Sequence, residues 1–360
     1  MIVELKDVCN KDTSNIRQKD IIDKSGDYPI YGASGLVGNV NFYQQEKESV
    51  AVVKDGAGIG RVMLLPAKAS IIGTMQYLIP KENILPEYLY YAVRNMHLEK
   101  YYSGATIPHI YFKDYQKEKI NLVSLKQQRE IVTLFNSIEN VINKKKNELS
   151  KLDTLIKARF VEMFGDIKNN QKYNYKQISS FTNVASGGTP KRDVKEYWDN
   201  GTIPWIKTTE LKNKKVNSTE EYITKSGLQN SSAKLVPAHT ILIAMYGQGK
   251  TRGMTAYLEK EAATNQACAC ILPSSNINSE YLWQYLIMSY NELRNMAKGG
   301  NQPNLNSCII KNFPVLYPPV SLQNKFASFV QQVDKSKVVI QKSLDETQTL
   351  FDSLMQKHFS

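Results

Sequence analysis

Two long stretches of the chain repeat apolar residues at alternating steps of four and three. The first repeat runs through Ile131, Phe135, Ile138, Ile142, Lys145, Leu149, Leu152, Ile156, Arg159 and Met163. The second runs through Leu322, Phe326, Phe329, Val333, Ser336, Ile340, Ser343, Thr347, Leu350 and Leu354. This spacing is that of a coiled-coil seam, and it predicts two long helices, over 124–165 and 321–360. Polar residues interrupt both seams, which favours one register at a cost in stability.

A helix of about 40 residues is roughly 60 Å long and cannot bury its apolar stripe alone. The nearest equivalent stripe is the other long helix. We therefore expect the two helices to pair in antiparallel orientation, which would relate the two halves of the chain by a pseudo-twofold axis. The alternative is that each helix packs only on the domain beside it.

The remaining segments, 1–123 and 166–320, contain short apolar runs separated by turn residues, and we interpret them as two α+β domains. They repeat one another. "SVAVVKDGAGIGRV" at 49–62 aligns without gaps with "TILIAMYGQGKTRG" at 240–253, so that Gly56 matches Gly247 and Arg61 matches Arg252. "PEYLYY" and "SEYLWQ", then "VSLKQQ" and "VSLQNK", follow in the same order. The chain is thus predicted to hold two copies of one domain-plus-helix unit.

The second loop of this pair resembles a phosphate-binding loop, because Gly249, Lys250 and Thr251 fit the end of that motif. Ala244 stands where the motif requires its first glycine. Gly253 follows at once, where a phosphate-binding loop would open a stable helix. A turn between two strands, with no nucleotide, is the better interpretation.

Composition and charge favour a polyanionic partner. The chain has 360 residues and a net charge of +12, and residues 166–320 hold 18 Lys and Arg against 11 Asp and Glu. Two similar domains on a chain of basic net charge, related by a pseudo-twofold axis, suit duplex DNA, whose backbone has the same symmetry. No membrane-spanning run or signal-peptide pattern is present, so we expect a cytoplasmic protein.

Cysteine and tryptophan residues add little evidence of chemistry. Cys9, Cys268, Cys270 and Cys308 lack the spacing of a zinc site, and we expect them to be buried thiols. Trp283 is expected in the core. Trp198 and Trp205 are expected to serve the core or a lid rather than to stack on DNA.

Motifs for methyl transfer are missing. Amino-methyltransferases hold the flipped base with Pro-Pro followed by an aromatic residue, whereas the sole Pro-Pro here, in "LYPPVS", is followed by valine. No Gly-x-Gly-x-x-Gly stands between a strand and a helix. The sequence therefore predicts a protein without catalytic or metal-binding residues.

Several segments together resemble one family. They are "ASGGTPKRDVKEYWDNGTIPWIKTTELKN", "YPIYGASGLVGNVNFY", "MYGQGKTRG", "TNQACACILP", "GGNQPNL" and "YPPVSLQNKF". Nearly the whole chain is similar to the specificity subunit of type I restriction-modification systems. The first domain departs from the pattern of the second, since it lacks the Gly-Gly-Thr-Pro and Tyr-Trp segments.

The resemblance implies two target recognition domains joined by two long antiparallel coiled-coil helices. It implies a non-catalytic subunit that reads an asymmetric, bipartite DNA site, one half per domain. It also implies two adenine methyltransferase subunits and an endonuclease-translocase subunit as partners, to which S-adenosylmethionine, ATP and magnesium would belong. Two alternatives remain: a coiled-coil scaffold for protein binding, and a specificity chain serving a fused methyltransferase-nuclease.

Candidate DNA contacts are cations and amides at predicted loops, where cations would hold phosphates and amides would read base edges. For each, an ordinary solvated surface residue is the alternative. In the second domain they are Lys191, Arg192, Lys207, Thr208, Lys214, Lys215, Gln248, Lys250, Thr251, Arg252, Asn301, Gln302 and Asn304. In the first they are Ser34, Asn39, Lys54, Arg61, His109, Tyr111 and Lys113.

Overall fold

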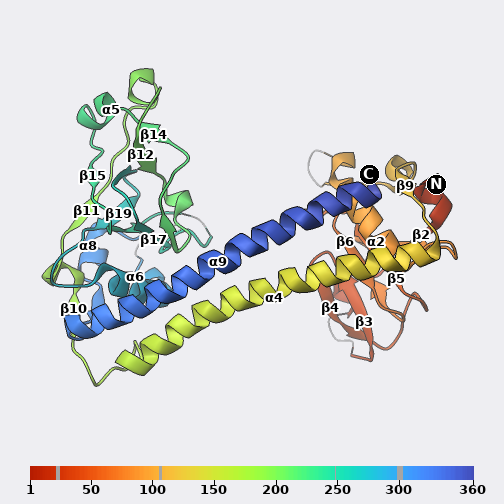
Figure 1. Ribbon diagram of the computed structural model, residues 1–360, viewed down its shortest axis with the longest axis horizontal. Coiled ribbons are helices and arrows are strands. Elements are labelled where there is room, and N and C mark those ends of the chain that lie inside the picture. The colour runs from red at the N-terminus through yellow and green to blue at the C-terminus, as the bar shows by residue number, and fades with distance from the viewer. Residues whose placement is uncertain (22–24, 105–107, 248, 298–302) are drawn as a thin grey trace. The chain divides into compact units, whose positions relative to one another are not determined.

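The chain forms two compact units, one of residues 1–148 with 340–360 and one of residues 149–339 (Figure 1). The structure is a computed structural model that describes residues 1–21, 25–104, 108–247, 249–297 and 303–360. Each unit contains one β-rich domain, one stretch of helix α4 (Leu125–Phe164) and one stretch of helix α9 (Val320–Phe359). None of the helices in the described ranges is long and apolar enough to cross a membrane.

The two long helices pair in antiparallel orientation within each unit. In the first unit, Phe135 packs on Phe351 with ring centroids 5.3 Å apart, and Lys145 Nζ donates to Ser343 Oγ at 2.8 Å. In the second unit, Lys337 Nζ lies 2.6 Å from the Asp153 carboxylate, and Phe160 packs on Phe326 at 5.5 Å. Residue numbers rise along α4 while they fall along α9, so the predicted antiparallel pairing is confirmed in each unit.

The seam of α9 differs from its prediction near the C-terminus. Leu350 is 52% exposed, whereas Phe351 is 2% exposed and Met355 is also buried. The buried stripe is therefore displaced by one residue from the predicted one. Ser336 and Ser343 define the register weakly, and turning Phe351 inward removes more apolar surface from water than turning Leu350 inward.

The domain of the first unit is built on two sheets. One has the strand order β2-β8-β5-β6 and the other β4-β3-β7, while β1 pairs with β9. Helix α2 packs on β5 and β6 (Figure 1). The bounds are β1 Ile2–Glu4, α1 Leu5–Val8, β2 Cys9–Thr13, η1 Gln18–Ile21, β3 Tyr28–Gly32, β4 Gly35–Val40, β5 Ser49–Val53, β6 Val62–Leu65, β7 Ser70–Ile71, β8 Met75–Pro80, α2 Pro86–Asn95, η2 Leu98–Tyr101, α3 Phe112–Tyr115 and β9 Lys119–Asn121.

The domain of the second unit repeats this plan with additions. Its sheets have the orders β11-β19-β16-β17-β13 and β14-β12-β18-β15, and β10 pairs with β20. The bounds are β10 Tyr175–Gln177, η3 Ile178–Ser180, β11 Val184–Ser186, η4 Lys195–Tyr197, β12 Ile203–Ile206, η5 Thr208–Glu210, β13 Lys214–Val216, β14 Tyr222–Ile223, α5 Lys225–Gln229, β15 Leu235–Val236, β16 Ile241–Ala244, β17 Thr255–Leu258, β18 Ala262–Thr264, β19 Cys268–Ile271, α6 Ser279–Met288, α7 Tyr290–Asn295, α8 Ser307–Lys311 and β20 Pro314–Leu316.

The internal repeat is confirmed by the strand pairing. The run β2-β8-β5-β6 corresponds to β11-β19-β16-β17, and the parallel pair β3 and β7 corresponds to the parallel pair β12 and β18. The match of "VSLKQQ" to "VSLQNK" is two residues out of register. Gln128 Oε1 accepts from Leu85 N before α2, and Gln323 Oε1 accepts from Asn278 N before α6, so Gln128 corresponds to Gln323.

Most of the predicted core residues are buried. Trp283 is 4% exposed and its indole N–H donates to Thr255 Oγ1 at 2.9 Å, as befits a core tryptophan. Cys9, Cys268 and Cys270 are buried, and burial raises the pKa of the Cys270 thiol to about 11. The prediction for Cys308 was wrong, because Cys308 is exposed on the short helix α8.

Candidate nucleic-acid interface

Each domain places a glycine-containing loop between two antiparallel strands, β5 and β6 in the first and β16 and β17 in the second. Gly60 N donates to Val53 O, and Gly253 N donates to Ala244 O, both at 2.9 Å. Both glycines have positive φ, +80° and +83°, which favours glycine. The hairpin interpretation is thus confirmed.

The predicted match of Arg61 to Arg252 is wrong. Gly60 and Gly253 occupy the same position at the closed end of each hairpin, so Arg61 follows that position while Arg252 precedes it. The second loop is two residues longer than the first, counted between the flanking strands. An alignment without gaps cannot accommodate this difference.

Both arginines bind main-chain oxygens of a neighbouring segment. Arg61 Nη1 donates to Ala33 O at 2.6 Å, beside Ser34 in the turn between β3 and β4. Arg252 Nη1 donates to Pro303 O, and its side chain is half-buried. Each arginine therefore ties its loop to another part of the same domain. Contact of either with DNA stays a prediction.

In the second domain, main-chain hydrogen bonds bring several candidate segments to one edge. Gly188 N donates to Thr264 O at 2.8 Å, Met245 N to Ala267 O at 2.8 Å, and Leu305 N to Met245 O at 3.0 Å. The Gly-Gly-Thr-Pro segment and the loop after β16 therefore both contact the segment 264–267, and the loop after β16 also contacts the segment around Asn304. Gln248, Asn301 and Gln302 lie outside the described residues.

The two glycines of the Gly-Gly-Thr-Pro segment are required by close packing. A Cβ on Gly187 would lie 2.2 Å from Thr264 Oγ1, and one on Gly188 would lie 2.3 Å from the carbonyl carbon of Ser232. The indole N–H of Trp205 donates to Gly188 O at 3.0 Å. The segment is thus fixed against β12 and β18, and it holds Lys191 and Arg192 at the edge of the domain.

Arg192 lies against two tryptophans and a carboxylate, although about half of its side chain remains exposed at 52%. Its guanidinium lies 3.8 Å from the ring centroid of Trp198 and 4.7 Å from that of Trp205, and it forms an ion pair with Glu221. The two indole rings meet edge to face at 5.1 Å. Both tryptophans therefore pack within the domain, and the charge of Arg192 is already neutralised.

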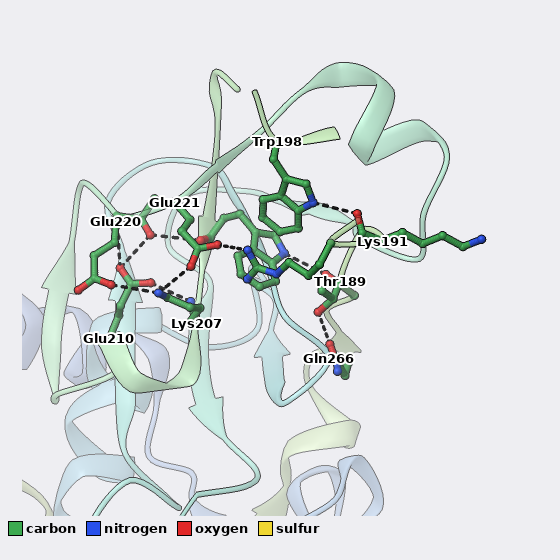
Figure 2. Close-up of polar contacts among 12 residues, drawn as sticks. Thr189, Lys191, Trp198, Lys207, Glu210, Glu220, Glu221 and Gln266 are labelled. Atoms are coloured by element: carbon green, nitrogen blue, oxygen red, sulfur yellow. Dashed lines mark hydrogen bonds and ion pairs between the residues drawn. The ribbon is translucent and has the colours of Figure 1, made fainter. Parts of the chain in front are cut away.

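Lys207 shares the carboxylate of Glu221. Lys207 Nζ lies 2.7 Å from Glu221 and 3.0 Å from Glu220 (Figure 2). The hydrogen bonds that Lys207 donates to Glu221 and Glu220 raise the pKa of Lys207. Burial opposes the charge of Glu221, but hydrogen bonds from Arg192 and Lys207 outweigh it and lower the pKa of that carboxyl. Lys207 thus stays protonated and paired in the free protein.

Lys215 belongs to a buried ion-pair network. Its Nζ lies 2.9 Å from Glu280 on α6 and 2.7 Å from Asp334 on α9, and the Glu280 side chain is only 5% exposed. Burial opposes the charge of Lys215, yet the hydrogen bond that Lys215 donates to Asp334 and the charge of Glu280 raise the pKa of Lys215. Lys215 joins the sheet to two helices of the unit.

The remaining candidate cations of the second domain are exposed. Lys191, Lys214 and Lys250 form no side-chain ion pair, hydrogen bond or ring contact with any described residue. Figure 2 shows the ammonium group of Lys191 pointing away from the paired cluster. Thr208 begins η5 and Thr251 lies in the loop, both half-buried. These three lysines are available to a polyanion without breaking an existing pair.

In the first domain, the structure brings together Lys54, His109, Tyr111 and Lys113. His109 Nδ1 hydrogen-bonds the Asp55 carboxylate, and Lys54 Nζ lies 3.9 Å from the same residue. The His109 and Tyr111 rings lie 4.0 Å apart, and Lys113 Nζ lies 5.2 Å from the Tyr111 ring centroid. Asn39 is exposed on β4, opposite Pro29 and away from this cluster.

Sequence reasoning missed two residues at the second loop. Tyr290 and Arg294 on α7 hydrogen-bond the main chain of residues 249–252. Their spacing of four residues is a signal for side chains that share one helix face. That spacing alone does not reveal the loop to which they bind.

Comparison with known proteins places the fold in a family. The model of the family described as "Type I restriction modification DNA specificity domain" matches residues 1–151 and 170–347. The specificity subunit of the type I restriction enzyme EcoR124I/EcoR124II from Escherichia coli is 28% identical over 163 residues, covering 44% of this chain and 40% of that protein. The alignment thus spans less than half of this relative.

A longer alignment with another specificity subunit and two solved structures of similar fold add to this comparison. The MjaIX specificity subunit of Methanocaldococcus jannaschii is 23% identical over 325 residues, covering 84% of this chain and 74% of that protein. The S subunit of a type I restriction-modification system from M. genitalium has a similar fold, with a TM-score of 0.64 at 16% identity, and covers 100% of this chain and 96% of its own. A structure concerned with assembly of the type I R-M system has a TM-score of 0.56 at 15% identity, over 100% and 97% of the two chains.

Proposed function

Because the chain belongs to the family of type I restriction-modification DNA specificity domains, we propose that it reads an asymmetric, bipartite site on duplex DNA, one part with each β-rich domain. DNA recognition is the function of the chain. The division of labour between the two domains is our proposal, and the duplicated domain plan is the observation that carries it. Each copy has its own hairpin loop with different side chains, so we expect each to select a different sequence.

The residues that we propose as DNA contacts are the exposed candidates. Lys191, Lys214 and Lys250 in the second domain would bind phosphates, because no acidic partner among the described residues competes for them. In the first domain Lys113 and Tyr111, which are exposed, would serve the same purpose, whereas Lys54 is half-buried and lies 3.9 Å from the Asp55 carboxylate. Arg61 and Arg252 would act by fixing the two loops.

The partners in this proposal are protein subunits of the same restriction-modification system. We propose two adenine methyltransferase subunits and an endonuclease-translocase, with methylation and cleavage carried out by them at the site that this chain selects. The chain itself would need no cofactor. A cytoplasmic location, where the DNA and these subunits meet, completes the proposal.

The test is the salt dependence of DNA binding by the chain in complex with its methyltransferase. Neutralisation of several phosphates gives a steep fall in affinity with salt, with a slope of about 0.9 per phosphate on a double-logarithmic plot. A protein-binding scaffold with an incidental basic surface would show no DNA binding in this assay. A specificity chain serving a fused methyltransferase-nuclease would bind DNA equally, and co-purification of one fused partner would identify it.

A further inference from the structure

Side chains of helix α7 donate hydrogen bonds to three main-chain oxygens of the loop that follows β16. Arg294 Nη1 donates to Arg252 O at 2.6 Å, and Arg294 Nη2 donates to Gly249 O at 2.9 Å. The Tyr290 hydroxyl donates to Lys250 O at 2.6 Å. Two side chains thus bind the carbonyl oxygens of three of the four residues in 249–252.

The two side chains that bind the loop, Tyr290 and Arg294, are themselves fixed by their neighbours. Arg294 Nη1 also donates to the Tyr290 hydroxyl at 3.1 Å, and its guanidinium lies 5.3 Å from the Tyr290 ring centroid. Leu293 anchors α7 in the core with no exposed surface. Gly253, at φ +83°, lets the loop pass close to the helix, since a Cβ there would lie 3.0 Å from Arg294 Cγ.

Among the described residues of the first domain, no arginine on a helix donates to the main chain of the loop between β5 and β6. There the segment η2 approaches the loop, and a Cβ on Gly60 would lie 2.6 Å from Glu99 N. The longer second loop therefore has a support that the shorter first loop does not share. A loop fixed before DNA arrives loses less conformational entropy on binding, and it presents its side chains in one arrangement.

We propose that Tyr290 and Arg294 are positioning residues for sequence recognition by the second domain, acting through the main chain of residues 249–252. This inference rests on the proposed function. Three carbonyls of this segment accept from side chains of α7, while Lys250 is exposed to solvent. Release of the segment would therefore weaken base discrimination in the part of the site read by the second domain and leave the other part unchanged.

The test uses the complete complex of the chain with its methyltransferase. The wild-type motif is first mapped by methyladenine sequencing, and methylation rates are then measured on duplexes with single base changes in each part. We expect Arg294→Ala to reduce discrimination in one part by roughly tenfold, the amount that one well-placed base contact supplies. We expect Tyr290→Phe, which removes a single hydroxyl, to act on the same part to a smaller degree.

Lys168→Ala is the matched control, because Lys168 Nζ lies 2.9 Å from Glu292 on the same helix but does not contact the loop. It should leave discrimination in both parts unchanged. Unaltered discrimination in Tyr290→Phe and in any active Arg294→Ala complex would overturn the inference, as would an equal loss in both parts. A wild-type chain that yields no bipartite motif would instead overturn the proposed function.

Discussion

Arg192 stacks on Trp198, with the guanidinium carbon 3.8 Å from the ring centroid. Glu221 pairs with the same guanidinium, so a carboxylate of the same domain already compensates the positive charge of Arg192. The positive charge of Lys207 is compensated in the same way, because Lys207 contacts both Glu220 and Glu221. Lys191, one residue before Arg192, has no acidic partner among the described residues. Neighbouring cations are thus divided into a structural set and an available set.

This division predicts different salt slopes for single variants. We expect Lys191→Ala to reduce the slope of DNA binding by about 1, because one phosphate contact would be lost. Lys207→Ala should leave the slope unchanged, because Lys207 pairs with the carboxylates of Glu220 and Glu221 and not with a phosphate. Titration of a labelled duplex at several salt concentrations measures both slopes. Equal slopes in the two variants would contradict the assignment.

Gly188→Ala is expected to destabilise the second unit by about 2 kcal/mol, the usual range for a side chain forced into packed surroundings. The added Cβ would lie 2.3 Å from Ser232 main chain and would displace the acceptor of the Trp205 indole. Thermal unfolding followed by tryptophan fluorescence would report the change. Gly38→Ala is the control, because a Cβ there has no atom within 4 Å. A Gly188→Ala protein as stable as wild type would refute the packing account.

Gln128 and Gln323 are expected to be equivalent supports at the N-terminal ends of the long helices. Gln128 Nε2 donates to Asn83 O and Val123 O, and Gln323 Nε2 donates to Pro318 O. Both side chains are fully buried. Either substitution to alanine should cost about 2–4 kcal/mol of unfolding free energy, because several main-chain groups lose their partners without gaining water.

Chemical denaturation of Gln128→Ala and Gln323→Ala, beside the exposed control Gln332→Ala, tests that equivalence. The control should match wild type. If Gln128→Ala or Gln323→Ala unfolds at the same denaturant concentration as wild type, these hydrogen bonds contribute little to the free energy of unfolding.

Lys215→Ala should be among the most destabilising single changes in the second unit. It would leave the buried Glu280 carboxylate without its cation, a loss of about 3–5 kcal/mol when one partner of a buried pair is removed. Lys215→Met with Glu280→Gln should recover much of the loss, because no unpaired charge remains at Glu280. Unfolding curves of the single and double variants would decide, and a double variant less stable than Lys215→Ala would contradict the explanation.

Much of this fold follows from the sequence because its signals are local and repeated. The four-three spacing through Phe135 and Phe326 is enough to predict two long helices, and the glycines near Gly60 and Gly253 mark two hairpins. Register is harder to predict. The two-residue difference between the loops and the displacement from Leu350 to Phe351 depend on which side chains pack best in three dimensions, which a linear comparison does not contain.

The sequence identifies candidate cations but not their ion pairs. Lys191, Arg192 and Lys207 are chosen from charge and loop position, and their contact with DNA stays a prediction. Charge and loop position do not reveal that Glu221, fourteen residues beyond Lys207, neutralises two of these cations. Nor do they reveal Arg294, whose role at the loop depends on the docking of α7. Both facts arise from contacts between segments distant in sequence.

Methyladenine sequencing of DNA from cells that express this chain with its methyltransferase tests the central claim most directly. We predict one methylated motif with two specific parts of different sequence, separated by a spacer of fixed length in which every base is tolerated. A single continuous motif, or a motif whose two parts are identical by symmetry, would contradict reading by two different domains of one chain.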